Sequence, residues 1–377
     1  MFKFKVISDN KDLLGKKVLL RLDLNVPIDN AGEIEDDYRI RKALPTIELL
    51  QKSGAKIIII SHIGRDPNES LEGVSKYCQK FFNHHFLKDI FSDKTKDYID
   101  KMNDGDIVVL ENLRQNKGEV ENDKDFVDKL AGLGEIYVNE AFSNSHRDHA
   151  SMTGLPKLMP AYAGLRFDQE VRMLGKAFNP PDPFLLIVGG AKFETKLPLV
   201  KKFSSIANLV FLGGALANDV FRYYGFNVGQ SLVSSAGIED IESIIDTGRV
   251  ITPADVLTEK GNIKDPRHLS DDDKIVDSGK VAVEVLSKLI FSAKFIIWNG
   301  PLGVYEDGYI KATEEIAKAV IDSDAEAIIG GGDTAVAVSK FEHTDEQVFI
   351  STGGGAMLDF LADERLVAID ALEGSLG

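Results

Sequence analysis

Arginine, histidine and short polar side chains follow several apolar runs in the first half of the chain. Asp23 and Asn25 come after one run, and His62 comes after the next. Arginine binds phosphate and carboxylate groups through its planar fork of donors, although a single arginine is more often part of a surface ion pair. Several arginines after neighbouring strands predict a basic pocket for a small, multiply anionic substrate, in which His62 would donate a hydrogen bond and Asp23 and Asn25 would bind hydroxyl groups. The arginines in question are Arg39, Arg65, Arg114 and Arg147.

In the second half of the chain, the apolar runs end in glycine instead. Glycine permits tight turns and a close approach of backbone to a ligand, and the free N–H groups of a following helix attract phosphate. Several such turns at one sheet edge predict a backbone-walled cleft for a nucleotide. Lys192 and Lys196, four residues apart on one helical face, would supply positive charge, although two surface lysines after an ordinary turn are the alternative. The turns lie at residues 189–190, 213–214, 330–332 and 353–355.

Asp333 follows one of these glycine turns and allows two interpretations. A carboxylate beside bound phosphate could hold Mg²⁺, which prefers carboxylate, phosphate and water oxygens. Alternatively, Asp333 could simply be the N-cap of the next helix. We expect Thr334 to cap that helix and its N–H groups to face a phosphate.

The elements that must position these residues alternate between strand-length apolar runs and segments with helical spacing. This alternation predicts an α/β fold with largely parallel, doubly wound sheets, and ligands then bind beyond the carboxyl ends of the strands. The predicted strands cover residues 17–22, 56–60, 107–110, 136–139, 184–188, 208–212, 249–252, 294–298, 325–329 and 347–350, and the predicted helices include 41–52, 196–203, 312–322 and 334–340.

A proline cluster at residues 179–183 is the expected domain boundary, because it cannot continue a helix. The segment 168–178 before it has the pattern of one helix that connects two domains. We therefore predict an N-terminal domain at 1–166, an interdomain hinge helix at 167–179 and a second domain at 180–359.

Composition excludes several classes of function. A chain of 377 residues exceeds the usual size of one core, and its net charge of -16 argues against a nucleic-acid-binding surface. Cys78 is the sole cysteine, so neither an internal disulfide nor a cysteine-built zinc site can form. No signal-peptide core or membrane-length apolar run is present, which favours a cytoplasmic protein without a membrane partner.

Taken together, these motifs resemble the phosphoglycerate kinase family over nearly the whole chain. The first half carries the resemblance in residues 21–27 (RLDLNVP), 61–65 (SHIGR), 111–114 (ENLR) and 146–151 (HRDHAS). The second half carries it in residues 189–192 (GGAK), 298–306 (WNGPLGVYE), 330–334 (GGGDT) and 351–355 (STGGG).

The resemblance implies two Rossmann-like domains around a hinge that transfer a phosphoryl group between ATP and 3-phosphoglycerate with Mg²⁺, giving ADP and 1,3-bisphosphoglycerate. It implies a monomer whose C-terminal tail, about 360–377, packs back on the first domain. The implied phosphoglycerate site is Asp23, Asn25, Arg39, His62, Arg65, Arg114 and Arg147. The implied groups at the transferring phosphoryl are Arg39, Lys192, Gly332 and Gly354. The implied nucleotide site is Lys196, Gly213, Gly214, Pro301, Glu306, Gly331, Gly332, Asp333 and Thr334, with Asp333 as metal ligand.

Other classes of protein lack support in the sequence. A nicotinamide-dependent dehydrogenase needs G-x-G-x-x-G after its first strand, and a P-loop kinase needs G-x-x-x-x-G-K-[ST]; neither pattern occurs where it is required. A catalytically silent nucleotide-binding protein of the same fold remains the alternative. The segment 277–280 (DSGK) lacks the proline of the family's Asp-x-Gly-Pro-Lys loop, which puts the details of the nucleotide loop in question.

Overall fold

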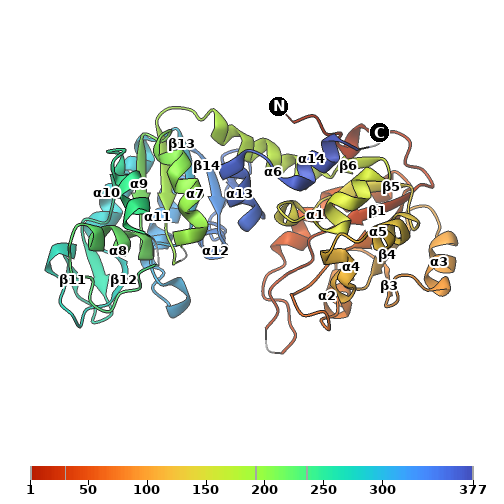
Figure 1. The fold of residues 1–377 in the computed structure, drawn as a ribbon, viewed down its shortest axis with the longest axis horizontal. Helices are drawn as coiled ribbons and strands as arrows, with labels where there is room; N and C mark the ends of the chain where they lie inside the picture. Colours follow the sequence, from red (N-terminus) through yellow and green to blue (C-terminus); the bar gives the residue numbers. More distant parts are fainter. Residues whose placement is uncertain (1, 30, 192, 235–236, 376–377) are drawn as a thin grey trace. The chain divides into compact units, whose positions relative to one another are not determined.

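The computed structural model describes residues 2–29, 31–191, 193–234 and 237–375. The chain divides into two compact units. The first contains the residues up to Arg172 together with the segment from Arg365 onward, and the second runs from Met173 to Glu364. Each unit is built around its own parallel sheet (Figure 1).

The first unit has a six-stranded sheet in the order β3-β4-β2-β1-β5-β6, in which every neighbouring pair is parallel. Its central strands are apolar and buried, as expected for a parallel sheet whose two faces are both covered. The strands are β1 (Lys17–Arg21), β2 (Lys56–Ile60), β3 (His85–Leu87), β4 (Ile107–Leu110), β5 (Ile136–Asn139) and β6 (Ala161–Ala163).

Two helices of the first unit begin where a polar side chain accepts from one of their first N–H groups. Ser92 Oγ accepts from the backbone N–H of Thr95 at 3.2 Å, and Asp123 accepts from that of Phe126 at 2.9 Å. The last helix of the chain, α14, packs on β6 and on the π-helical turn η4 (Ala150–Gly154) (Figure 1). The helices are α1 (Tyr38–Lys52), α2 (Glu72–Cys78), α3 (Asp93–Asp100), α4 (Lys117–Val120), α5 (Lys124–Ala131) and α14 (Val367–Glu373).

The second unit repeats this plan with the strand order β15-β14-β13-β7-β8-β9, again parallel throughout. Its centre is fully apolar, and Trp298 on β13 is completely buried. The strands are β7 (Phe184–Val188), β8 (Leu209–Leu212), β9 (Val250–Ile251), β13 (Phe295–Asn299), β14 (Glu326–Gly330) and β15 (Val348–Ile350). The helices are α7 (Phe193–Ser204), α8 (Gly214–Tyr223), α9 (Ile238–Ile245), α10 (Lys280–Ser292), α11 (Lys311–Asp322), α12 (Gly332–Val338) and α13 (Gly355–Asp363).

Helix α6 (Leu165–Gly175) carries the chain from the first unit into the second, since the division falls between Arg172 and Met173. At its start, the buried carboxylate of Glu140 accepts from the backbone N–H groups of Arg166 and Phe167, each at 3.1 Å. Glu140 therefore replaces the missing helical partners of this end.

The predicted α/β class with two parallel sheets is confirmed, and the ten predicted strands all occur within a few residues of their predicted ends. Short strands β3 and β6 were not predicted, and neither was an antiparallel sheet of β10 (Val256–Thr258), β11 (Ile263–Lys264) and β12 (Ile275–Ser278). The missed strands are only two to four residues long, and each carries little periodicity of its own. In the part of the chain that the structure describes, no helix is both long and apolar enough to cross a bilayer.

Candidate active site

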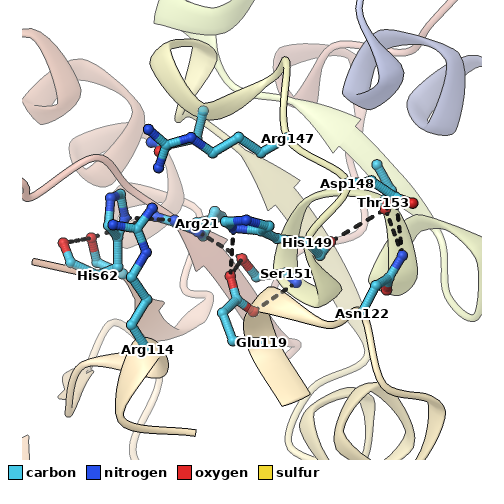
Figure 2. Close-up of polar contacts among 12 residues, drawn as sticks. Arg21, His62, Arg114, Glu119, Asn122, Arg147, Asp148, His149, Ser151 and Thr153 are labelled. Atoms are coloured by element: carbon cyan, nitrogen blue, oxygen red, sulfur yellow. Dashed lines mark hydrogen bonds and ion pairs between the residues drawn. The ribbon is translucent and has the colours of Figure 1, made fainter. Parts of the chain in front are cut away.

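The cationic residues of the first unit come together beyond the carboxyl ends of its strands. Arg21 is the last residue of β1, and His62 lies two residues after β2. Arg114 belongs to the 3₁₀ turn η2 (Leu113–Gln115) after β4, and Arg147 lies in the loop that follows β5. Figure 2 shows these side chains grouped around His62 and Arg21. The parallel sheet thus delivers charges from distant sequence positions to one place.

The electrostatics of this cluster favour a bound anion. Burial, together with the neighbouring Arg147 and Arg21, lowers the pKa of Arg114 to about 10. Burial also lowers the pKa of Arg147, and nearby Arg65 adds to that effect. Asp23 and Glu119 oppose these shifts only in part. Like charges held together repel each other, so a phosphate or carboxylate that enters the cluster relieves an existing repulsion.

Both histidines of the cluster are neutral near pH 7. Burial, followed by Arg21, Arg114 and Arg147, lowers the pKa of His62 far below its ordinary value. The same causes lower the pKa of His149 to about 4. The two rings can therefore donate hydrogen bonds to an anion without adding charge.

Arg39, in the first turn of α1, is held by the loop after β1. Its Nη1 lies 2.9 Å from the Asp23 carboxylate and donates to the backbone carbonyl of Asn25 at 2.9 Å. The amide oxygen of Asn25 accepts from the N–H of Gly64 at 2.9 Å, which ties this loop to the one after β2. The arginine head group is thus pre-positioned, with a third of its side chain exposed.

In the second unit, a cavity of about 500 Å³ opens beyond the carboxyl ends of the strands. Its size lies in the ordinary range for small-molecule sites. Predicted residues on its wall are Lys196, Gly214, Pro301, Glu306, Gly331, Gly332 and Asp333. Asp277 and Asn299, from two motifs noted in the sequence, also line it, and residues that the sequence reasoning did not single out include Asn218 and Leu232.

Close backbone packing requires glycine on this wall and directly beside it. A Cβ atom on Gly189 would lie 2.1 Å from the carbonyl oxygen of Pro301. Gly214 has φ +57°, and a Cβ there would lie 2.6 Å from the backbone nitrogen of Gly190. Gly213 is the N-cap of α8 and packs against Leu302 instead of facing the cavity. The turns between strands and helices are therefore so tight that side chains cannot fit.

Asp333 projects into this cavity from the first turn of α12. Burial and the nearby carboxylate of Glu306 raise its pKa, whereas Lys196 opposes that shift. The interpretation of Asp333 as a helix N-cap is wrong, because Gly331 occupies that position with φ +95°. Thr334 does not cap the helix either, since its hydroxyl accepts from the N–H of Gly300 at 3.1 Å.

Other predicted residues occupy distinct positions. Lys196, only 8% exposed, donates to the carbonyl oxygen of Gly189. Gly354, with φ +53°, is the N-cap of α13. Lys192 lies outside the described residues.

The chemistry of the second cavity suits a magnesium–nucleotide complex. Asp333 and Glu306 bring two carboxylates near each other, and their mutual repulsion contributes to the raised pKa of Asp333. Among the described residues, no group of three or more His, Cys, Asp or Glu side chains could hold a metal alone. Mg²⁺ bound through one or two carboxylates and substrate phosphates needs no such group.

The sequence reasoning overlooked Arg21 and His149 as part of the basic cluster. Arg21 is 1% exposed at the end of a strand, and His149 lies 3.9 Å from the buried carboxylate of Glu119. A charged residue that directly continues a buried apolar run was the available signal for Arg21, because burial of an arginine requires partners.

Comparison with known proteins gives a consistent result. Residues 7–364 match the family described as phosphoglycerate kinase. Phosphoglycerate kinase from Coxiella burnetii is 32% identical with a TM-score of 0.85, covering 98% of this chain and 99% of that one. Phosphoglycerate kinase from Pyrococcus horikoshii OT3 is 30% identical with a TM-score of 0.87, covering 98% of each chain. With this match over nearly its full length, the chain belongs to the phosphoglycerate kinase family.

Proposed function

We propose that this protein catalyses the reversible, Mg²⁺-dependent transfer of a phosphoryl group between ATP and 3-phosphoglycerate, giving ADP and 1,3-bisphosphoglycerate. The observation that carries the proposal is the pairing of a cationic cluster in one unit with a glycine-walled cavity in the other. The first suits a small, multiply charged acceptor, and the second suits a nucleotide. Family membership supports the same chemistry.

In the first unit, the cationic cluster would bind the phosphate of 3-phosphoglycerate. Asp23 and Asn25 would bind its hydroxyl group. The substrate carboxylate is already ionised at neutral pH, so it can attack phosphorus without a general base on the protein. Arg39 would then face the transferring phosphoryl group and neutralise charge that develops there. The residues assigned to the phosphate are His62, Arg65, Arg114 and Arg147.

In the second unit, the cavity would bind ATP. Gly214 and Pro301 would form the adenine side, with Gly213 behind them as the N-cap of α8, while Lys196, Glu306 and Thr334 would contact the phosphate–metal region. Asp333 would hold Mg²⁺, which neutralises phosphate charge when it is bound. Backbone N–H groups would bind the phosphoryl oxygens together with Lys192; these groups belong to Gly331, Gly332 and Gly354.

The reaction also requires movement. Acceptor and donor are assigned to different units, so the proposal includes a hinge-bending step that brings the two bound substrates together and excludes water from the acyl phosphate product. We further propose that the protein is a cytoplasmic monomer that acts in glycolysis and gluconeogenesis. The proposed domain limits are 1–166, 167–179 and 180–359, with the tail from about 360 on the first domain.

A catalytically silent nucleotide-binding protein is the competing hypothesis. The retained Arg39 and Asp333 weigh against it, because a protein that only binds nucleotide has no need for an arginine held by Asp23 in the other unit.

The test is a coupled assay of ATP-dependent 3-phosphoglycerate phosphorylation with Mg²⁺, run on wild type and Arg39→Ala. Loss of this charge should lower kcat by about a hundredfold or more, while ATP affinity measured by calorimetry stays unchanged. Arg41→Ala is the matched control, since Arg41 lies on the same helix and pairs with Asp37 at 2.7 Å. A silent wild type that still binds ATP would favour the competing hypothesis, and a protein without nucleotide binding would refute both.

A further inference from the structure

A chain of buried polar contacts lies beneath the cationic cluster of the first unit. The carboxylate of Glu119, on α4, accepts from the hydroxyl of Ser151 at 2.7 Å and from its backbone N–H at 3.0 Å. The Ser151 hydroxyl in turn accepts from Nε of Arg21 at 2.9 Å. Nη2 of Arg21 then reaches Nδ1 of His62 at 2.9 Å. Figure 2 shows this continuous path from Glu119 to His62.

All four side chains on this path are almost completely inaccessible to solvent. Glu119 and Ser151 are 0% exposed, while Arg21 and His62 are each 1% exposed. Burial raises the pKa of Glu119, and the positive charge of Arg21 and the hydrogen bonds from Ser151 oppose that shift. A buried arginine and a buried carboxylate are tolerated only as compensated partners, and here Ser151 links them.

The direction of each hydrogen bond on this path is fixed by chemistry. A guanidinium group has donors and no acceptor, so Nδ1 of His62 must accept from Arg21 with its lone pair. The proton of the neutral ring is then on Nε2. The only proton of the Ser151 hydroxyl goes to Glu119, which leaves an oxygen lone pair for Arg21.

We propose that Glu119 and Ser151 are positioning residues, which hold Arg21 so that His62 is fixed as the neutral tautomer with its proton on Nε2. His62 then presents a preset N–H donor to an anion in the cluster. Binding of the anion then carries no free-energy cost for fixing the orientation and the tautomer of the His62 ring. The effect on 3-phosphoglycerate rests on the proposed function, whereas the tautomer does not.

The environment of His62 reinforces this assignment. The charged and titratable groups that act on its ring are Arg21, Arg114, Arg147 and His149, which are all cationic or neutral. A second proton on this ring would be repelled by the arginines and would displace Arg21 from Nδ1. Protonation should therefore be absent throughout the physiological pH range.

The first experiment is nitrogen NMR on the intact protein with ¹⁵N-labelled histidine rings, between pH 5.5 and 8. Wild-type His62, assigned by its loss in His62→Gln, should show an unprotonated Nδ1 and a protonated Nε2, without titration. Ser151→Ala and Glu119→Gln should shift this pattern toward a mixture of tautomers. A His62 that titrates in this range, or carries its proton on Nδ1, would overturn the proposal.

Thr153→Ala provides a matched control for loosening of the same π-helical turn. The Thr153 hydroxyl is bonded to Asp148 and to Asn122, and it takes no part in the path to Arg21. This variant should keep the wild-type His62 spectrum. If it changes the spectrum as much as Ser151→Ala does, general loosening and not the specific path is responsible, and the proposal fails.

The kinetic consequence is measured separately. Ser151→Ala should raise KM for 3-phosphoglycerate about tenfold, the range expected for one lost hydrogen bond, with KM for ATP unchanged. A normal His62 spectrum in a protein without kinase activity would keep the structural assignment and refute the proposed function. A Ser151→Ala variant with wild-type spectrum and KM, folded by thermal melting, would refute the positioning role.

Discussion

The two units use the same type of sheet edge to make opposite kinds of binding site. The first unit lines its edge with arginine and histidine side chains, whose pKa values are lowered by burial and then by the neighbouring arginines. The second lines its edge with glycines, so that backbone groups form much of the wall. Under the proposed function, the first site would recognise charge, and the second would recognise shape and offer N–H groups. The same architecture can therefore hold two different ligands, because the residues after the strands, and not the fold, set the chemistry of each site.

The largest loss of stability and of nucleotide affinity is expected when a side chain is added directly beside the backbone-built wall of the cavity in the second unit. Gly189→Ala would put a Cβ 2.1 Å from the Pro301 carbonyl oxygen, and overpacking of this kind costs about 3 kcal/mol or more. Thermal unfolding and ATP titration should show a destabilised second unit with weak nucleotide binding. Gly73→Ala, where the added Cβ meets no atom within 4 Å, is the control. Wild-type ATP affinity in Gly189→Ala would show that the wall is not backbone-built.

In the first unit, removal of one charge should reduce substrate affinity and leave the fold intact. Arg114→Ala deletes a partly buried cation whose pKa is already lowered by burial and by Arg147. We expect 3-phosphoglycerate to bind about ten- to a hundredfold more weakly, as for a lost hydrogen bond to a charged group. ATP affinity should not change. Calorimetry with each ligand separately checks this, and an equal loss of both affinities would contradict the separation of the two sites.

The pH dependence of stability should expose a buried acid at the start of α6. Burial raises the pKa of Glu140 from 4.5 to about 7. The folded state therefore holds this proton more tightly than the unfolded state, and the resulting stability is present below pH 4.5 and lost as the pH rises through 7. Between pH 5 and 8, the unfolding free energy of wild type should fall by about 2 kcal/mol relative to Glu140→Gln. Parallel pH profiles from urea unfolding would refute this shift.

The smallest effect is expected from an ionisable side chain on the glycine-walled cavity. Burial raises the pKa of Asp277 to about 6, and Asp277 lines the cavity. As the pH falls from 7.5 to 5.5, Asp277 loses its charge, which removes repulsion of phosphate. ATP affinity of wild type relative to Asp277→Asn should rise about twofold over that range. A ratio that is independent of pH would show that Asp277 does not act on the nucleotide.

Sequence patterns predicted the strands well where apolar runs were long. They missed β3, β6 and the small antiparallel sheet, because two- to four-residue strands are stabilised by their neighbours and not by their own pattern. The residues that follow the strands were useful for predicting the basic pocket, since the structure brings His62, Arg114 and Arg147 together. The interpretation of Asp333 as N-cap of α12 and the prediction that Thr334 caps this helix were wrong, because Gly331 with φ +95° takes the N-cap position.

The amino-acid sequence was enough to predict the α/β class, the cationic and glycine-rich character of the two strand edges, and the family. These follow from local periodicity and from short motifs that can be read in order along the chain. The contacts between buried groups, in contrast, depend on how the folded chain packs. Glu119, Ser151, Arg21 and His62 come from four separate segments, and their hydrogen bonds exist because the sheet order brings those segments into contact. Burial, which shifts the pKa values, and the contact between Arg21 and His62, which would set the tautomer, are properties of that packing and not of any one segment.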